Sequence, residues 1–427
     1  MPKYECFSKT QLLEMKNELI ESYKKFKAKG LQLNMSRGKP GADQLDLSLG
    51  VLSCISDSEN CKSESGADCR NYGTLDGIPE AKRLFSDMLE VTPEEIIIGG
   101  NSSLNMMYDT FARAMIHGVL GSDKPWAKLE KVKFLCPCPG YDRHFTICEH
   151  FGVEMINIRN TSEGPDMEEV KRLAQSDDSI KGIWCTPKYS NPEGITYTDD
   201  VVDAFAALKP AAPDFRIFWD NAYCVHHLSE EQDTLKNILT TLRANGKEDM
   251  VFMYGSTSKV SFPGSGVAMM AASKANIAFT KKQLFAQTIG PDELNQLRHV
   301  RFFKNLDGIK EHMKKHAAIL KPKFDAVINT FENELSGKGI AEWTSPRGGY
   351  FISLNTLDGC AKRTVELCFE AGVIITPAGA TYPYGKDPRD RNIRIAPTFP
   401  LIAELVTAID LFCLCVKLAA VEKLLEA

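Results

Sequence analysis

The sequence predicts an α/β protein: a large domain built on a mainly parallel sheet of seven strands, with a smaller α+β domain beside it. Most strand candidates are continuous apolar runs, as is typical of strands covered on both faces. Helical patterns separate them, which favours crossover connections between parallel strands. The chain has 427 residues, enough for roughly two domains. The seven predicted strands are 96–98, 132–136, 153–158, 182–185, 217–219, 250–254 and 267–271.

The two ends of the chain differ from its middle. Residues 11–30 form a charged amphipathic helix pattern, and a long helix is expected over 305–335. A hairpin over 340–354, turning at Pro346–Gly349, follows it. We place the boundaries so that residues 1–48 belong to the small domain, 49–303 form the large domain and 304–427 complete the small one. The remaining elements expected in the C-terminal part are a helix over 364–371, strands over 373–376 and 392–396, and a helix from 401.

Composition narrows the functional class. A net charge of −5 and a content of 25% charged residues predict a globular protein with no basic footprint for nucleic acid. No apolar run reaches the roughly 18 residues that span a membrane. The 13 cysteines are odd in number and scattered, so we expect reduced thiols and a cytoplasmic protein. Cys136 and Cys138 have no second pair at zinc-ligand spacing, which predicts buried thiols and no metal site.

A lysine follows one of the predicted strands in a context suited to covalent chemistry. Ser256-Thr257-Ser258-Lys259 comes directly after the run 250–254. The amine of such a lysine can form a Schiff base with a carbonyl compound, while the hydroxyls hold an anionic group beside it. The alternative is a solvated lysine at the end of a strand.

Other polar residues follow other predicted strands. Gly99–Ser103 lies between a strand and a helix and could hold a phosphate, although a capped glycine turn has the same pattern. Tyr141 could stack on a flat ring or belong to the core. Asn191 offers an amide donor in an Asn-Pro turn. Asp220 follows an apolar run and needs a partner; a protonated ring nitrogen would serve, and a helix cap is the alternative.

These sites, in this order, resemble those of the fold-type I aminotransferases that use pyridoxal 5′-phosphate, and the resemblance spans nearly the whole chain. Within that group the sequence is similar to aspartate aminotransferases related to the sensor domains of MocR-type regulators. The resemblance implies a transaminase with L-aspartate and 2-oxoglutarate as the expected amino acid and 2-oxo acid substrates. It also implies a homodimer with shared active sites.

The resemblance also assigns roles at the cofactor's ring. Lys259 is implied to be the Schiff-base lysine, which afterwards moves the proton between the substrate Cα and the cofactor. Asp220 is implied to pair with the ring nitrogen and Tyr141 to stack on the ring. Asn191 and Tyr223 are implied to donate hydrogen bonds to the ring's phenolate oxygen.

Further roles concern the phosphate and the substrate. The implied phosphate ligands are Asn101, Ser102, Ser103, Ser256 and Ser258, with Tyr72 reaching the phosphate of the partner subunit. Arg394 is implied to grip the substrate α-carboxylate, a task suited to a planar guanidinium, with Asn191 and Gly38 beside the substrate.

The sequence departs from the family at one phosphate ligand. The family has an arginine shortly after the lysine, whereas this chain has Gly266 at about that place. We expect a basic residue distant in sequence to compensate, with Arg37 and Lys274 as candidates. The residue that binds the substrate side chain is also not assigned, and its candidates are Arg37, Arg143, Arg298 and Arg347.

Two other functions stay open at this point. A β-lyase or decarboxylase could use the same scaffold and cofactor. A non-enzymatic effector-sensing module of a transcriptional regulator is a third possibility, but residues 1–50 hold one helix and a loop, without a basic winged-helix segment.

Overall fold

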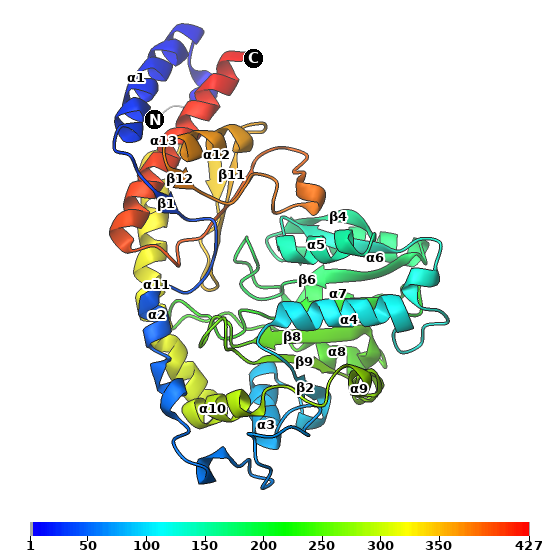
Figure 1. Ribbon diagram of the computed structural model, residues 1–427. Helices are drawn as coiled ribbons and strands as arrows, with labels where there is room; N and C mark the ends of the chain where they lie inside the picture. Colours follow the sequence, from blue (N-terminus) through cyan, green and yellow to red (C-terminus); the bar gives the residue numbers. More distant parts are fainter. Residues whose placement is uncertain (1–2, 427) are drawn as a thin grey trace.

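Figure 1 shows the computed structural model of the chain, in which residues 3–426 are described. Its centre is an eight-stranded sheet with the strand order β2-β9-β8-β7-β6-β3-β4-β5. The strands are β2 (Ile96–Ile98), β3 (Lys133–Cys138), β4 (Glu154–Thr161), β5 (Gly164–Pro165), β6 (Ile180–Cys185), β7 (Arg216–Asp220), β8 (Val251–Ser256) and β9 (Ala268–Ala272). All seven predicted strands are confirmed. The expected number was nevertheless one too low, because β5 is only two residues long and carries no apolar pattern.

The sheet is mainly parallel. Strands β4, β3, β6, β7 and β8 run parallel to one another. Strand β9 is antiparallel to both of its neighbours, and β5 is antiparallel to β4. The carboxyl ends of β6, β7 and β8 therefore meet at one edge of the sheet, which is where ligands bind in open α/β sheets.

Both faces of the sheet are covered, which explains the continuous apolar runs. In β7 the side chains of Ile217 and Trp219 join one hydrophobic core, and Phe218 between them joins another on the opposite face. Helices α3, α6, α7, α8 and α10 contribute to the first core, and α4, α5 and α9 to the second. Their bounds are α3 (Pro79–Leu89), α4 (Ser103–His117), α5 (Asp142–His150), α6 (Met167–Ser176), α7 (Asp199–Ala207), α8 (Ile238–Ala244), α9 (Lys274–Gln287) and α10 (Glu293–Phe303).

A second layer of structure lies beside the sheet (Figure 1). Strands β10 (Ala341–Trp343), β11 (Ile352–Thr356) and β13 (Asn392–Ile395) form an antiparallel sheet, and β1 (Leu33–Asn34) pairs with β12 (Val373–Ile374) in parallel. The predicted hairpin is confirmed, with Trp343 opposite Leu354. The helices here are α1 (Lys9–Lys27), α2 (Ala42–Asp46), α11 (Leu306–Leu335), α12 (Ala361–Glu370) and α13 (Ile402–Glu426).

The N-terminal helix packs against C-terminal elements. Leu12 and Tyr23 of α1 share a hydrophobic core with Phe331 of α11 and Phe412 of α13. The Tyr23 hydroxyl also donates a hydrogen bond of 2.7 Å to the carbonyl oxygen of Leu367. These contacts support grouping residues 1–48 with 304–427, and the three boundaries themselves stay a prediction.

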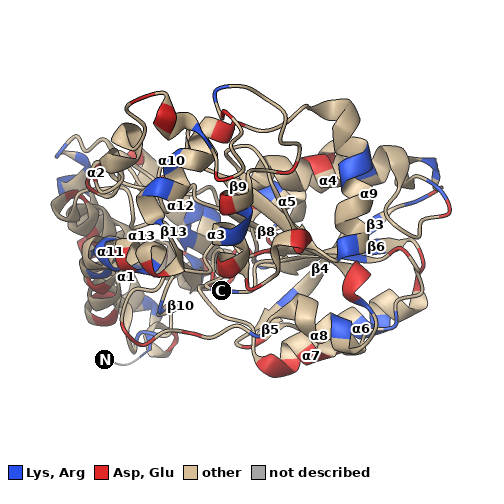
Figure 2. Ribbon diagram, turned by 90° about the horizontal axis from the view of Figure 1, so that it is seen from below, with Lys and Arg blue, Asp and Glu red and all other residues tan. Residues whose placement is uncertain are grey.

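Charged residues of both signs are interspersed along the helices and loops (Figure 2). Within residues 3–426, no helix combines the length and apolar character needed to cross a membrane. The 13 cysteines are free thiols, and Cys136 and Cys138 are buried as predicted. In the same described range, no three His, Cys, Asp or Glu side chains gather as a metal site would require.

A buried ion pair anchors the amino end of β6. The Asp214 carboxylate accepts hydrogen bonds from Lys181 Nζ at 2.7 Å, Ser122 Oγ at 2.8 Å and Trp126 Nε1 at 2.9 Å. Burial acts to raise the pKa of Asp214, but these donors outweigh it and hold the pKa below the ordinary value of 3.8. The carboxylate therefore stays charged and joins three separate segments.

Replacing Asp214 by Ala should destabilise the protein by about 3–5 kcal/mol, because the buried Lys181 ammonium loses its partner. Urea unfolding followed by tryptophan fluorescence measures this loss. The matched control is Asp203→Ala, which breaks an exposed pair with Lys236 and should cost less than about 1 kcal/mol. Equal effects of the two substitutions would contradict the structural role of Asp214.

Candidate active site

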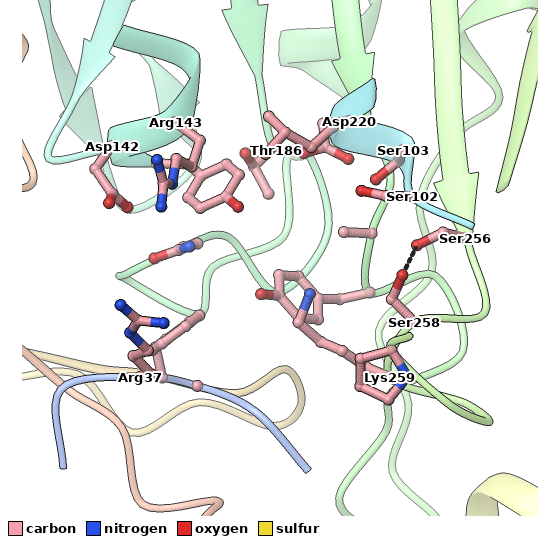
Figure 3. Close-up of a pocket in the computed structure, with 18 of the residues that line it drawn as sticks. Arg37, Ser102, Ser103, Asp142, Arg143, Thr186, Asp220, Ser256, Ser258 and Lys259 are labelled. Atoms are coloured by element: carbon pink, nitrogen blue, oxygen red, sulfur yellow. Dashed lines mark hydrogen bonds between the residues drawn. The ribbon is translucent and has the colours of Figure 1, made fainter. Parts of the chain in front are cut away.

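A cavity of about 360 Å³ opens at the carboxyl ends of β6, β7 and β8 (Figure 3). Thr186 directly follows β6, Asp220 ends β7 and Ser256 ends β8, and all three line it. The N-terminal loop contributes Ser36–Gly38 to the opposite wall. The other residues of the wall are Ser102, Ser103, Leu104, Tyr141, Asp142, Arg143, Asn191, Ala222, Tyr223, Ser258, Lys259, Pro263, Phe351 and Arg394.

Lys259 points into this cavity from the loop after β8 (Figure 3). Its Nζ lies over the rings of Tyr223 and Tyr350, at 5.0 Å and 5.9 Å from their centres. The Tyr350 hydroxyl donates to the Lys259 carbonyl oxygen at 3.4 Å, which fixes the backbone. Burial lowers the pKa of the Lys259 amine below 10.5, and the Asp220 carboxylate opposes this shift. The neutral, nucleophilic amine is therefore more accessible here than in water.

Asp220 is buried, with one oxygen held and the other free. His144 Nε2 lies 3.1 Å from Oδ2 of Asp220, and the His144 ring stacks on Trp184 with its centre 4.4 Å away and the planes 7° apart. The other oxygen, Oδ1, has no hydrogen-bond partner among residues 3–426. A buried carboxylate oxygen without a donor is costly. A cationic N–H from a ligand would satisfy it.

Hydroxyls and a helix N-terminus face one another at one end of the cavity. Ser102 and Ser103 begin α4, and Figure 3 shows them near Ser256 and Ser258. Ser256 Oγ donates to Ser258 Oγ at 3.1 Å. The Ser102 side chain makes no capping hydrogen bond within the described chain, so it is available to a ligand. Helix N-termini with hydroxyls beside them bind anions such as phosphate.

Asn101 does not line the cavity and has a supporting place. Its side-chain Nδ2 donates to the carbonyl oxygen of Gly264 at 3.2 Å, and its own carbonyl oxygen accepts from Ser258 Oγ at 3.1 Å. Asn101 therefore ties the loop after Lys259 to the start of α4. Its predicted direct contact with a phosphate stays a prediction.

Arg394 lies in β13 at the opposite end of the cavity from these serines. Its Nη1 donates to Asp142 Oδ1 at 2.9 Å and to Asn191 Oδ1 at 3.2 Å. The guanidinium carbon stands 5.0 Å from the centre of the Phe351 ring. The end of that ring packs against Gly38, where an added Cβ would come within 2.4 Å of Phe351 Cζ. Gly38 thus allows Phe351 to support Arg394.

Asn191, Tyr141 and Tyr223 line the middle of the cavity. Because the oxygen of Asn191 accepts from Arg394, its amide N–H₂ is the group left for a ligand. Burial raises the pKa of both tyrosine hydroxyls, so each stays protonated and able to donate. Tyr141 meets the His144 ring edge to face, with 5.0 Å between centres.

Tyr72 lies outside this cavity. The residue is 73% exposed. This is compatible with the predicted contact with a partner subunit, which stays a prediction.

The structure separates the four arginines left open by the sequence. Arg37 and Arg143 line the cavity, and both are exposed. Arg298 and Arg347 do not line it, and Arg347 pairs with Glu231 at 2.7 Å. Arg37 and Arg143 are therefore the candidates for binding a second acidic group of a substrate.

The two cations considered for the phosphate lie elsewhere. Arg37 stands across the cavity from the four serines in Figure 3. Lys274 does not line the cavity, and its Nζ lies 3.9 Å from Glu94. At Gly266 an added Cβ would lie 3.1 Å from both Phe262 O and Thr257 Oγ1. A side chain at this position would therefore require its neighbours to shift by a few tenths of an ångström.

Sequence reasoning missed His144, Asp142, Thr186 and Phe351. His144 and Asp142 belong to the helix that starts right after Tyr141, so extending the search one turn past Tyr141 would have found them. Thr186 directly follows a predicted strand, which is the same signal that drew attention to Asp220. Phe351 has no such feature, since an aromatic residue in a hairpin is expected to belong to the hydrophobic core.

This set of side chains fits pyridoxal 5′-phosphate. The cavity offers an amine, a buried carboxylate with a free oxygen, an anion site of hydroxyls and helix N–H groups, and tyrosine donors between them. A guanidinium for a carboxylate lies at the far end. Each group has a counterpart among the cofactor's aldehyde, ring nitrogen, phosphate and phenolate oxygen, and the substrate.

Comparison with known proteins supports this interpretation along the whole chain. The sequence profile of the family described as aspartate amino-transferase matches residues 7–427. The aspartate aminotransferase of Corynebacterium glutamicum is 40% identical over 430 residues, covering 99% of each chain.

Solved structures agree with the fold. The crystal structure of an aspartate transaminase from Corynebacterium glutamicum superposes with a TM-score of 0.96 at 40% identity, covering 98% of this chain and 99% of that one. An α-aminoadipate aminotransferase from Thermus thermophilus, complexed with N-(5′-phosphopyridoxyl)-L-leucine, has a TM-score of 0.73 at 17% identity over 96% of this chain and 95% of that one, and so shares the fold. By its profile, its identity to relatives and its fold, the chain belongs to the aspartate aminotransferase family of pyridoxal-phosphate enzymes and is an aminotransferase.

Proposed function

We propose that this aminotransferase moves the amino group of L-aspartate to 2-oxoglutarate. The observation that carries the proposal is the grouping of Arg37, Arg143 and Arg394 around one cavity. Both substrates carry two carboxylates, and one guanidinium alone would match a monocarboxylic amino acid equally well. The name of the 40% identical relative, an aspartate aminotransferase, points the same way.

Pyridoxal phosphate, when bound, supplies an aldehyde for the amino group and a ring that takes up electrons from the substrate Cα. The protein residues bind, orient and move protons around it. Lys259 would hold the cofactor through its Nζ and, once released, act as the base at Cα. Burial favours the neutral form of this amine, which is the form that accepts a proton.

Asp220 would hold a proton on the cofactor's ring nitrogen. Its free Oδ1 supports this role, since that atom needs a donor. His144, stacked on Trp184, holds the second oxygen and so fixes the orientation of the carboxylate. Tyr223 and the amide of Asn191 would donate to the phenolate oxygen from the other side.

Arg394 would bind the α-carboxylate that both substrates share. Phe351 and Gly38 hold its guanidinium plane, and Asn191 fixes one of its nitrogens. Arg37 and Arg143 would bind the distal carboxylate. Both are exposed and line the cavity, so they can reach a substrate without first losing much hydration.

The phosphate would be bound chiefly by neutral donors of this chain. Ser102, Ser103, Ser256 and Ser258 supply hydroxyls, and α4 supplies its N-terminal N–H groups. The packing around Gly266 supports the view that these donors replace the family's arginine. Tyr72 of a second copy of the chain would complete the group.

Substrate selectivity tests the proposal. Arg37→Ala and Arg143→Ala should each lower kcat/KM for aspartate by about tenfold or more, the loss of one charge-assisted contact, and should leave kcat/KM for alanine, which has no distal carboxylate, almost unchanged. The control is Arg172→Ala, which removes an exposed arginine of α6. Steady-state rates with each amino acid, in the presence and absence of 2-oxoglutarate, provide the measurement.

Two outcomes would contradict the proposal. Parallel losses for aspartate and alanine would show that neither arginine reads the distal carboxylate. Continuous turnover without any 2-oxo acid would indicate a lyase or decarboxylase.

The charge of Asp220 should be visible at Lys259. Because the Asp220 carboxylate opposes the lowering of the Lys259 pKa, Asp220→Asn should lower that pKa further. In cofactor-free protein, acetic anhydride should then modify Lys259 faster than in the wild type when the two proteins are compared at the same pH. Mass spectrometry of the modified peptide at a series of pH values measures this. The control Asp166→Asn, on a pair with the exposed Arg159, should leave the profile unchanged, and an unchanged profile in both variants contradicts the electrostatic coupling.

Subunit sharing is tested with mixed dimers. A dimer of one Tyr72→Phe chain and one Lys259→Ala chain places both lesions in one site if Tyr72 serves the partner. The other site is then intact, and the mixed dimer should have about half the activity of the wild type, the value for one of two independent sites. If the mixed dimer gives no more than half the activity of the Tyr72→Phe dimer, Tyr72 acts within its own chain.

A further inference from the structure

Arg394 already holds a carboxylate of the protein itself. Asp142 Oδ1 accepts from Nη1 of Arg394 at 2.9 Å, although the two residues are 252 positions apart in sequence. Asp142 is the first residue of α5, beside the large sheet, whereas Arg394 lies in β13 of the small sheet. The ion pair therefore bridges two walls of the cavity.

The pair uses the part of Arg394 that a substrate would need. Nη1 of a guanidinium has two hydrogens. In Arg394 one is donated to Asp142 and the other to Asn191, at 3.2 Å. A carboxylate binds arginine best through two parallel N–H donors in one plane. An end-on carboxylate would have to take the Nη1 hydrogen that Asp142 now accepts.

The other edge of the guanidinium is closed. Nε of Arg394 is buried, without a hydrogen-bond partner within residues 3–426, and the guanidinium lies over the Phe351 ring. A ligand that approached through Nε would have to displace the side chains that bury this atom. The edge with Nη1 and Nη2 is thus the route that remains for a carboxylate.

Asp142 is placed so that it can leave. Its side chain is 35% exposed, compared with 8% for Arg394, and it projects toward the cavity beside Arg143 (Figure 3). A half-exposed carboxylate regains hydration when its ion pair breaks, so its release costs little. Arg394, by contrast, cannot remain buried and unpaired.

We propose that Asp142 is a resident competitor of the substrate: its carboxylate neutralises Arg394 in the empty cavity and exchanges with the α-carboxylate of the incoming amino acid or 2-oxo acid. This inference rests on the proposed role of Arg394 as the α-carboxylate site. The exchange keeps a buried guanidinium paired at every stage. It weakens the binding of all carboxylate ligands to the same extent, so a second carboxylate held by Arg37 and Arg143 becomes the means of achieving tight binding.

The test uses the holoenzyme and the dicarboxylate maleate, which has no amino group and cannot react. Asp142→Asn keeps the shape of the side chain and removes its charge. We expect the Kd of maleate, from titration of the cofactor's absorbance, to fall by about fivefold, the equivalent of one ordinary net hydrogen bond. KM for aspartate should fall in parallel, with kcat unchanged.

Controls separate competition from structural effects. Glu149→Gln removes a charge at the other, exposed end of α5 and should leave the Kd of maleate unchanged. Asp142→Ala should tighten maleate binding as Asp142→Asn does. Agreement between the two variants shows that the effect comes from the lost carboxylate and not from a new contact of the asparagine amide. If Asp142 instead serves to orient Arg394, both variants will raise the Kd of maleate and KM for aspartate, and the proposal fails.

A variant of Arg394 separates the proposed carboxylate site from the proposed competition by Asp142. Arg394→Gln should weaken maleate binding strongly. If it does not, the assignment of Arg394 to the α-carboxylate is wrong. If Arg394→Gln abolishes binding but neither Asp142 variant tightens it, the carboxylate site stands and the resident competitor is disproved.

Discussion

The ion balance around the Asp220 carboxylate is the constraint on which the rest of the site depends. A buried carboxylate must be compensated, and Asp220 stands at the end of a central strand with apolar side chains on both faces of the sheet before it. His144 satisfies one oxygen, and its position requires the aromatic stack on Trp184 from the neighbouring strand. The other oxygen has no hydrogen-bond partner within residues 3–426, and Asp220 lines the cavity together with Lys259. The sheet thus determines where a positive charge is stabilised, and the loops around it supply the groups that use this charge.

Much of the fold could be predicted from the sequence because burial on two faces leaves a plain pattern. Runs such as Ile217-Phe218-Trp219 alternate between two cores and are apolar throughout. The two-residue strand β5 leaves no such pattern. The residues after each strand were also predictable as a group, since parallel strands bring their carboxyl ends together. The resemblance to a family then assigned their roles.

What could not be predicted depends on contacts between distant segments. The pairing of Asp142 with Arg394 joins the start of one helix to a strand of another sheet. Nothing in the sequence around either residue indicates that it contacts the other. The difference between Arg37 and Arg143, which line the cavity, and Arg298 and Arg347, which do not, likewise depends on the fold, because all four are ordinary arginines in sequence. The close packing around Gly266 is likewise visible only in the folded chain.

The packing of α1 against α13 has a consequence for how the chain acquires its structure during synthesis. The hydrogen bond from Tyr23 to Leu367 closes a loop of 344 residues, and the large sheet lies entirely within that loop. The sheet is a continuous segment, so it can fold while the ribosome is still adding residues. Helix α1 is made before the sheet and cannot bury Leu12 and Tyr23 against α13 until that helix, which follows the sheet, has been made. Helix α1 is therefore covered later than the sheet that follows it, and in the interval its apolar side is open to chaperones.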